Sequence, residues 1–230
     1  MKNFIILILI TPILIFCQIT EDLIKIEQPI KKFYLKGAFV PGLSFETITV
    51  GEKYYQYSDK ESEEIFIEPG GGSGSFEGVI GYDISKLITL EISAGIQNSG
   101  ESVDDFKVKF KKFLIRASIL YKMPIDKYYV PYIGVGISRV ITGKYIEKSY
   151  DFVESEVIYK NPSGFHLLIG AEMKDPDFGL NLYGEIRLVM LGEFEMEESN
   201  IDEWILKDIG LDKMNANGLH FCIGIGYYLF

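Results

Sequence analysis

Cysteine is scarce in this chain, which has two in 230 residues. Cys17 lies in an N-terminal segment that we expect to be removed, so Cys222 remains alone in the mature protein. A single cysteine forms no intramolecular disulfide. We therefore expect packing and hydrogen bonding to supply the stability of the fold.

Basic residues are also in deficit, since 23 Lys and Arg stand against 33 Asp and Glu. The formal net charge of −10 argues against nucleic acid as a partner, because nucleic-acid binding depends on basic patches. We expect no polyanion partner of any kind.

Long hydrophobic runs are missing as well. The run from Phe4 to Phe16 is shorter than the about 20 apolar residues of a membrane-spanning helix, and Pro12 interrupts it. It follows Lys2, which is typical of a cleaved signal peptide. We predict a signal peptide at residues 1–17, a periplasmic lead at 18–32 and one barrel domain at 33–230. An alternative interpretation treats Cys17 as the lipidated cysteine of a lipoprotein.

What the mature chain has instead is alternation of apolar with polar or small residues, in segments of about ten. This length fits membrane-spanning strands, which need about 9–11 residues, better than soluble strands, which are most often about 5–6 residues long. We count eight such segments: Phe33–Ser44, Ser73–Tyr82, Leu87–Gln97, Phe106–Lys122, Tyr128–Gly143, Gly164–Met173, Leu180–Gly192 and Gly218–Phe230.

The connections between these segments alternate in length. Short turns follow Tyr82, Lys122 and Met173, whereas longer loops separate the other pairs. Bacterial outer-membrane barrels have short periplasmic turns and long outer loops. We therefore expect both chain ends on the periplasmic side.

The face opposite the apolar one is rich in Gly and Ser and carries only isolated charges. Small residues suit the crowded interior of an eight-stranded barrel, whereas the water-exposed face of a soluble barrel has few glycines. We predict an all-β fold, an eight-stranded antiparallel up-and-down transmembrane β-barrel in the outer membrane. The alternative is a soluble lipocalin-like carrier with the apolar face inward.

With this face assignment, seven charged side chains point into one lumen. Enclosed charges must be paired, because the desolvation penalty of a lone ion is several kcal/mol. We interpret them as a structural network, and the alternative is a gated polar path for small solutes. They are Lys36, Glu77, Glu91, Arg116, Glu172, Glu185 and Arg187.

Catalytic and metal sites are not indicated. His220 and Cys222 share a face and resemble the His-x-Ser of outer-membrane lipid A deacylases, but cysteine replaces serine and the pair should face the lumen. We interpret it as a packed pair, with a hydrolase as the less favoured alternative. His166 has no second ligand at metal spacing. We predict no catalytic residue, no cofactor and no metal.

Two of the long loops hold most of the acidity. Phe45–Gly72 has a net charge of −5 and Glu193–Asn217 a net charge of −6. We expect a solvated, variable surface, with Pro69-Gly70-Gly71-Gly72 as a flexible hinge. The sharper alternatives are divalent cations near lipid headgroups, without the spacing of a defined calcium site, or an extracellular basic partner.

The chain resembles the small outer-membrane β-barrels typified by the OmpA transmembrane domain and by OmpW. The resemblance rests on Pro131-Tyr132-Ile133-Gly134-Val135-Gly136-Ile137, on Gly224-Ile225-Gly226-Tyr227 and on the terminal aromatic residue. It implies contact with outer-membrane lipids and an assembly signal, Tyr228 and Phe230, read by the barrel-assembly machinery. Phe230 lies one step out of the usual register, because the apolar alternation ends on Leu229.

The predicted function is that of a non-enzymatic outer-membrane protein with a structural or surface-recognition role. A narrow channel for small or hydrophobic solutes is the second hypothesis, and a lipid-modifying hydrolase is the third. The fold does not decide among them, because one scaffold hosts all three.

Overall fold

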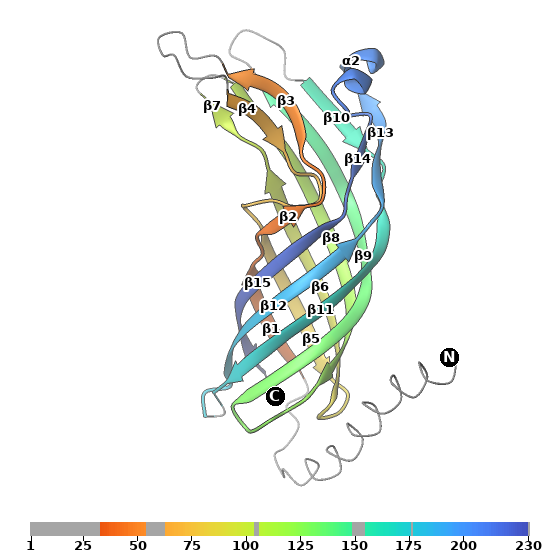
Figure 1. Cartoon of the computed structure of the whole chain (residues 1–230). Coiled ribbons are helices and arrows are strands. Elements are labelled where there is room, and N and C mark those ends of the chain that lie inside the picture. The colour runs from red at the N-terminus through yellow and green to blue at the C-terminus, as the bar shows by residue number, and fades with distance from the viewer. Residues whose placement is uncertain (1–32, 54–62, 104–105, 149–154, 176, 230) are drawn as a thin grey trace, which may run out of the picture. The chain divides into compact units, whose positions relative to one another are not determined.

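The computed structural model describes residues 33–53, 63–103, 106–148, 155–175 and 177–229. Eight long strands form a closed antiparallel barrel (Figure 1). In ring order they are β1 (Phe33–Phe39), β5 (Phe76–Asp83), β6 (Ile88–Ser99), β8 (Phe106–Lys122), β9 (Tyr129–Lys148), β11 (Ser163–Lys174), β12 (Leu180–Met190) and β15 (Gly218–Tyr228).

The ring closes where the first of these strands meets the last. β1 pairs with β15 from Tyr34 opposite Tyr228 to Phe39 opposite Ile223, and it pairs with β5 on its other side. Closure gives every barrel strand two hydrogen-bonded neighbours, which is what a backbone in hydrocarbon requires. The prediction of an eight-stranded antiparallel barrel is confirmed.

The strand boundaries follow the alternation in the sequence. β8 has the predicted bounds, and the predicted turns join β5 to β6, β8 to β9 and β11 to β12. β15 finishes at the same end of the barrel as these short turns (Figure 1). The first predicted segment is interrupted after Phe39, so that β2 (Gly42–Ser44) is a separate short strand on β15.

The barrel carries its apolar side chains outside and its polar side chains inside, which is the reverse of a soluble protein. Ile137 on the outer face is 68% exposed, whereas Lys36 on the inner face is 5% exposed. Aromatic rings mark both ends of the apolar exterior: Phe33 packs on Tyr82 at the end with the short turns, and Phe39 packs on Phe76 near the other end. The lipocalin-like interpretation is wrong, because the apolar faces point outward and the polar faces inward.

Within the described part of the chain, no helix is long and apolar enough to cross a membrane.

The long connections are not the solvated loops that we expected. They contain β3 (Ile48–Lys53), β4 (Glu63–Ile67), β7 (Ser102–Val103), β10 (Ser155–Tyr159), β13 (Glu193–Ser199), the helix α2 (Glu203–Asp208) and β14 (Lys213–Asn215). β10 extends the sheet from the projecting end of β9, and β13 and β14 follow it in order. We call the structure built from these elements and from the projecting ends of β8 and β9 the cap (Figure 1).

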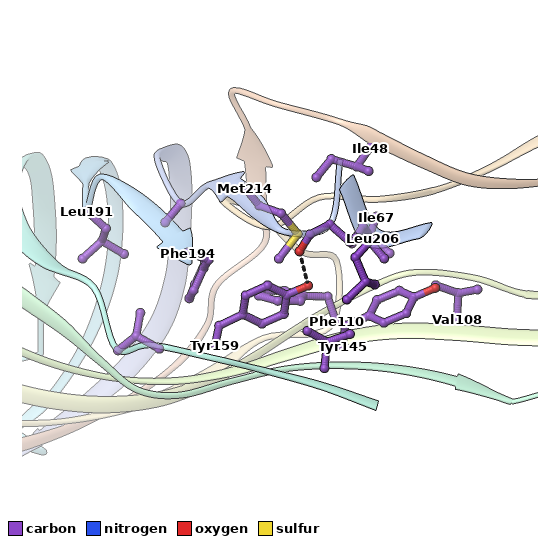
Figure 2. Close-up of a cluster of buried hydrophobic side chains, with 14 of the residues drawn as sticks. Ile48, Ile67, Val108, Phe110, Tyr145, Tyr159, Leu191, Phe194, Leu206 and Met214 are labelled. Carbon is purple, nitrogen blue, oxygen red and sulfur yellow. Dashed lines mark hydrogen bonds between the residues drawn. The ribbon is translucent and has the colours of Figure 1, made fainter. Parts of the chain in front are cut away.

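The cap has a hydrophobic core of its own. Phe110 of β8, Tyr159 of β10 and Phe194 of β13 meet edge to face, with ring centroids 5.1–5.9 Å apart. Ile67 and Leu206 join them and are fully buried (Figure 2). Burial in apolar surroundings stabilises the cap, so the expectation of solvated loops is wrong for the core residues of these segments.

One buried hydroxyl in this core has a hydrogen-bond partner. The Tyr159 hydroxyl donates a hydrogen bond to the carbonyl of Leu211 over 2.9 Å, drawn as a dashed line in Figure 2. Burial raises the pKa of the Tyr159 phenol well above its ordinary value. The hydroxyl therefore keeps its proton and remains a donor.

Candidate functional site in the barrel lumen

The middle of the lumen is organised around Glu77 of β5. Its carboxylate accepts a hydrogen bond from Arg116 of β8 and forms an ion pair with Arg187 of β12 over 3.0 Å. Arg187 also donates from Nε to Glu185 over 2.8 Å. All four side chains are buried. Two guanidinium groups and two carboxylates thus bridge strands from opposite parts of the ring.

A second cluster lies nearer the end with the short turns. The Lys36 ammonium lies 2.6 Å from Glu91 and 2.7 Å from Glu172, and the Tyr34 hydroxyl donates to Glu91 over 2.6 Å. The same ammonium lies 4.7 Å from the ring centroid of Tyr183. Lys36 is therefore enclosed by two carboxylates and an aromatic face, which offsets its desolvation.

All seven side chains assigned to the lumen from the sequence lie buried inside the barrel, in these two clusters. The structure adds to this network charged residues at the strand ends, which were not among the seven predicted from the sequence. Lys122 forms an ion pair with Asp83 over 2.9 Å and reaches Glu172 at 3.8 Å. Lys174 lies 3.7 Å from the same glutamate. The alternation could have found Lys122, because it shares the inward parity of Arg116 on β8.

The outer end of the lumen is covered by residues 69–72, which we call the strap. Lys112 donates to the carbonyl of Pro69 over 2.6 Å, and His220 Nε2 donates to the carbonyl of Gly70 over 2.9 Å. All four strap residues are buried. The prediction of a flexible hinge is wrong, because the carbonyls are held by lumen side chains.

Close backbone contact explains why the strap is glycine. A Cβ on Gly70 would lie 1.8 Å from the carbonyl oxygen of Asn217, and one on Gly71 would lie 2.6 Å from the carbonyl oxygen of Gly42. Any larger residue would push the strap off the neighbouring backbone. The glycines therefore let the strap lie against β2 and the start of β15.

The two histidines are held by polar neighbours. His166 lies between the hydroxyls of Ser118 and Ser138, at 2.9 and 2.8 Å. His220 Nδ1 lies 3.3 Å from Arg116, whereas the Cys222 thiol lies 3.8 Å from Glu185. His220 and Cys222 thus have separate polar partners inside the barrel.

Of the two residues of the expected assembly signal, the structure describes Tyr228 only. Tyr228 is buried at the lumen end of β15, where its hydroxyl lies 3.3 Å from Lys122 and 3.5 Å from Glu172. Phe230 lies outside the described residues. Tyr228 therefore has a structural contact, whatever its part in assembly.

The outer surface of the cap is acidic, and several acids have a lysine partner. Lys160 pairs with Glu195 over 3.0 Å, and Lys207 pairs with Glu203 over 2.8 Å. Glu197 and Glu198 of β13 are exposed beside them. Among the residues described, no three acidic, histidine or cysteine side chains are grouped as a metal site would need. The described part of this surface therefore carries mainly negative charge.

Comparison with known proteins supports the fold. No family model and no curated protein sequence matches the chain. Among crystal structures, Neisserial surface protein A is 16% identical, with a TM-score of 0.50, and the match covers 86% of this chain and 97% of that one. The outer membrane protein OprG from Pseudomonas aeruginosa is 13% identical, with a TM-score of 0.51 and a coverage of 86% and 98%. The chain therefore has the fold of the small eight-stranded outer-membrane β-barrels.

Proposed function

We propose that this protein is a non-enzymatic outer-membrane protein whose closed barrel anchors a folded recognition cap at the cell surface. The observation that carries the proposal is the lumen itself, filled by interlocked ion pairs and covered by the strap. The apolar exterior and the shared fold support the outer-membrane location. Insertion there would use the barrel-assembly machinery, with the last strand as its signal.

The filled lumen argues against a channel. Glu77 is shared by Arg116 and Arg187, so a passing ion would have to displace a buried carboxylate from two cations. Breaking a buried pair leaves an uncompensated charge, which costs about 3–5 kcal/mol. An open path would need these contacts to exchange rapidly, and nothing in their burial favours that.

The cap is the part that is suited to recognition. Binding residues commonly lie on loops that a rigid scaffold positions. Here the scaffold continues into the cap through β8 and β9, and the exposed Glu197 and Glu198 favour a basic extracellular partner. The acidic loops of the sequence thus become an ordered acidic surface.

Conductance in planar lipid bilayers tests the closed lumen. We expect the reconstituted protein to give no steady current above the protein-free bilayer. A Glu77→Ala variant should raise the frequency of transient openings, because Arg116 loses its carboxylate. A steady current through the unmodified protein that Glu185→Gln alters would overturn the proposal and favour the channel.

Location and chemistry need separate tests. We expect the protein in the outer-membrane fraction, with an electrophoretic mobility that shifts when the sample is boiled. On intact cells, an external protease should cut the cap and leave the barrel. A lipid-hydrolysing activity that Cys222→Ala abolishes would replace the proposal with the enzyme hypothesis.

A further inference from the structure

A row of lysines runs up the outer face of β8, above the apolar exterior. Lys107 and Lys111 are exposed and Lys109 is half-buried, whereas the intervening Val108 and Phe110 are buried in the cap. The net charge of the chain hides this local excess of positive charge. We call Lys107, Lys109, Lys111 and the neighbouring Lys144 the lysine ladder.

The pairing of β8 with β9 brings like charges together. Lys111 lies directly opposite Lys144, and Lys107 lies directly opposite Lys148. Like charges at directly opposed positions destabilise a sheet. Burial, together with the ammonium groups of Lys111 and Lys107, lowers the pKa of Lys109.

Among the described residues, carboxylates neutralise only part of that charge. Lys144 forms an ion pair with Glu156 of β10 over 2.6 Å, and each of the two side chains is about a third exposed. Such an exposed pair contributes little energy. Within the described residues, no carboxylate forms an ion pair with Lys107, Lys109 or Lys111, so an external anion would relieve their mutual repulsion.

The height of the ladder indicates which anion is available. On the outer face of β8, Ile119, Ile115 and Phe113 form the apolar stripe, and Lys111 is the next outward position. Two strand residues span about 7 Å, and the headgroup region on each side of a bilayer is about 5–8 Å thick. A bilayer that covers Phe113 therefore places its headgroups beside Lys111.

We propose that the lysine ladder binds the phosphate groups of anionic lipids in the leaflet nearest the cap. This inference rests on the proposed placement of the barrel in a membrane. Lysine side chains extend along apolar surface while their ammonium groups stay in the polar layer, which suits this position. The ladder points outward from the barrel wall, so lipid phosphate reaches it without entering the lumen or displacing the cap.

Lipid retention measures this preference directly. The full-length protein is reconstituted in vesicles of phosphatidylcholine mixed with phosphatidylglycerol and released in a neutral detergent, and its retained lipids are counted by native mass spectrometry. We expect phosphatidylglycerol to be enriched over its share of the vesicle, although the net charge of the protein would repel it. High salt should weaken the enrichment.

Charge-matched variants locate the preference. Lys107→Gln/Lys109→Gln/Lys111→Gln should reduce the enrichment by about threefold or more, since a basic residue at an anionic membrane surface contributes on the order of a fivefold change in affinity. Replacement of the three by arginine should keep it. The control Lys160→Gln/Lys207→Gln/Lys213→Gln removes the same charge from exposed cap positions and should keep it too.

Each outcome decides. Equal retention of both lipids by the unmodified protein overturns the inference, and this measurement needs no variant to fold. Equal losses in the ladder variant and in the control overturn it as well. Competition by inorganic phosphate, but not by chloride at equal ionic strength, would assign the ladder to free phosphate and overturn the lipid assignment. Failure of the protein to enter vesicles would instead contradict the proposed function.

Discussion

The two halves of β8 follow opposite rules. In the barrel half, Ile119 faces outward and Arg116 faces inward, whereas in the cap half Lys109 faces outward and Phe110 faces inward. The surroundings explain the reversal, because the barrel half is set in hydrocarbon and the cap half in water. One strand thus shows that each face is selected by its surroundings and not by a fixed inside-out rule.

The neighbouring strand marks the boundary with a bulge. β9 shifts register against β8 between Phe113, opposite Thr142, and Leu114, opposite Val140, so that Ile141 is the additional residue. Below it Val140 points inward, and above it Gly143 and Tyr145 do. An extra residue of this kind redirects the side chains that follow it. The strand therefore changes parity where it passes from lumen to cap.

The largest expected effect concerns the charged side chains inside the barrel half. Glu77→Gln leaves Arg116 buried without a carboxylate and should lower the free energy of unfolding by about 3–5 kcal/mol. Denaturant titration of the protein in lipid vesicles measures this. The control Glu195→Gln removes an exposed partner of Lys160 and should leave the stability almost unchanged. Similar unfolding midpoints for both variants would contradict the structural role of the network.

The next effect tests the outer face on the two sides of the boundary. Ile119→Lys places a charge on the lipid-facing wall, between Leu90 and Val135, and should destabilise the barrel by about 2–4 kcal/mol. Lys109→Ile on the same strand should leave the barrel stability within about 0.5 kcal/mol. Unfolding in vesicles measures both. A neutral Ile119→Lys would mean that this wall faces water.

The length of the alternating segments, the succession of short turns and long loops, and the small residues on one face were together enough to predict the barrel. Once the polar face was assigned inward, the seven lumen charges followed from their parity along the strands. Lys122 and Asp83 were missed because they stand at the strand ends, where the turn residues were assumed to begin.

The cap could not be predicted in the same way. Its strands are short, β10 having five residues and β14 three, and its core collects Ile67, Phe110 and Leu206 from distant parts of the chain. Acidic residues on the exposed faces dominated the composition and suggested solvated loops. The strap was misread because Gly70 and Gly71 serve close contact there and not flexibility.

A smaller effect concerns the strap at the boundary between the two regions. Gly71→Ala would set a Cβ 2.6 Å from the backbone of both Gly42 and Ser44, and such overpacking costs about 1–3 kcal/mol. The control Gly74→Ala meets no atom within 4 Å and should be close to neutral. Thermal unfolding followed by the electrophoretic mobility shift compares them. Equal stability would show that the strap is free to move, as the hinge interpretation required.

The smallest expected effect tests whether the interior of the cap is packed as a hydrophobic core. Ile67→Val removes one methylene from a fully buried cap residue and should lower the free energy of unfolding by about 0.5–1.5 kcal/mol. Ile80→Val on the lipid-facing wall should lower it less, because lipid fills the space left behind. Hydrogen exchange of the cap amides measures the first change, and that of the barrel amides should stay slow, because local units open independently. Faster exchange throughout the barrel would instead join cap and barrel into one cooperative unit, and the reversal along β8 would then lie inside a single core.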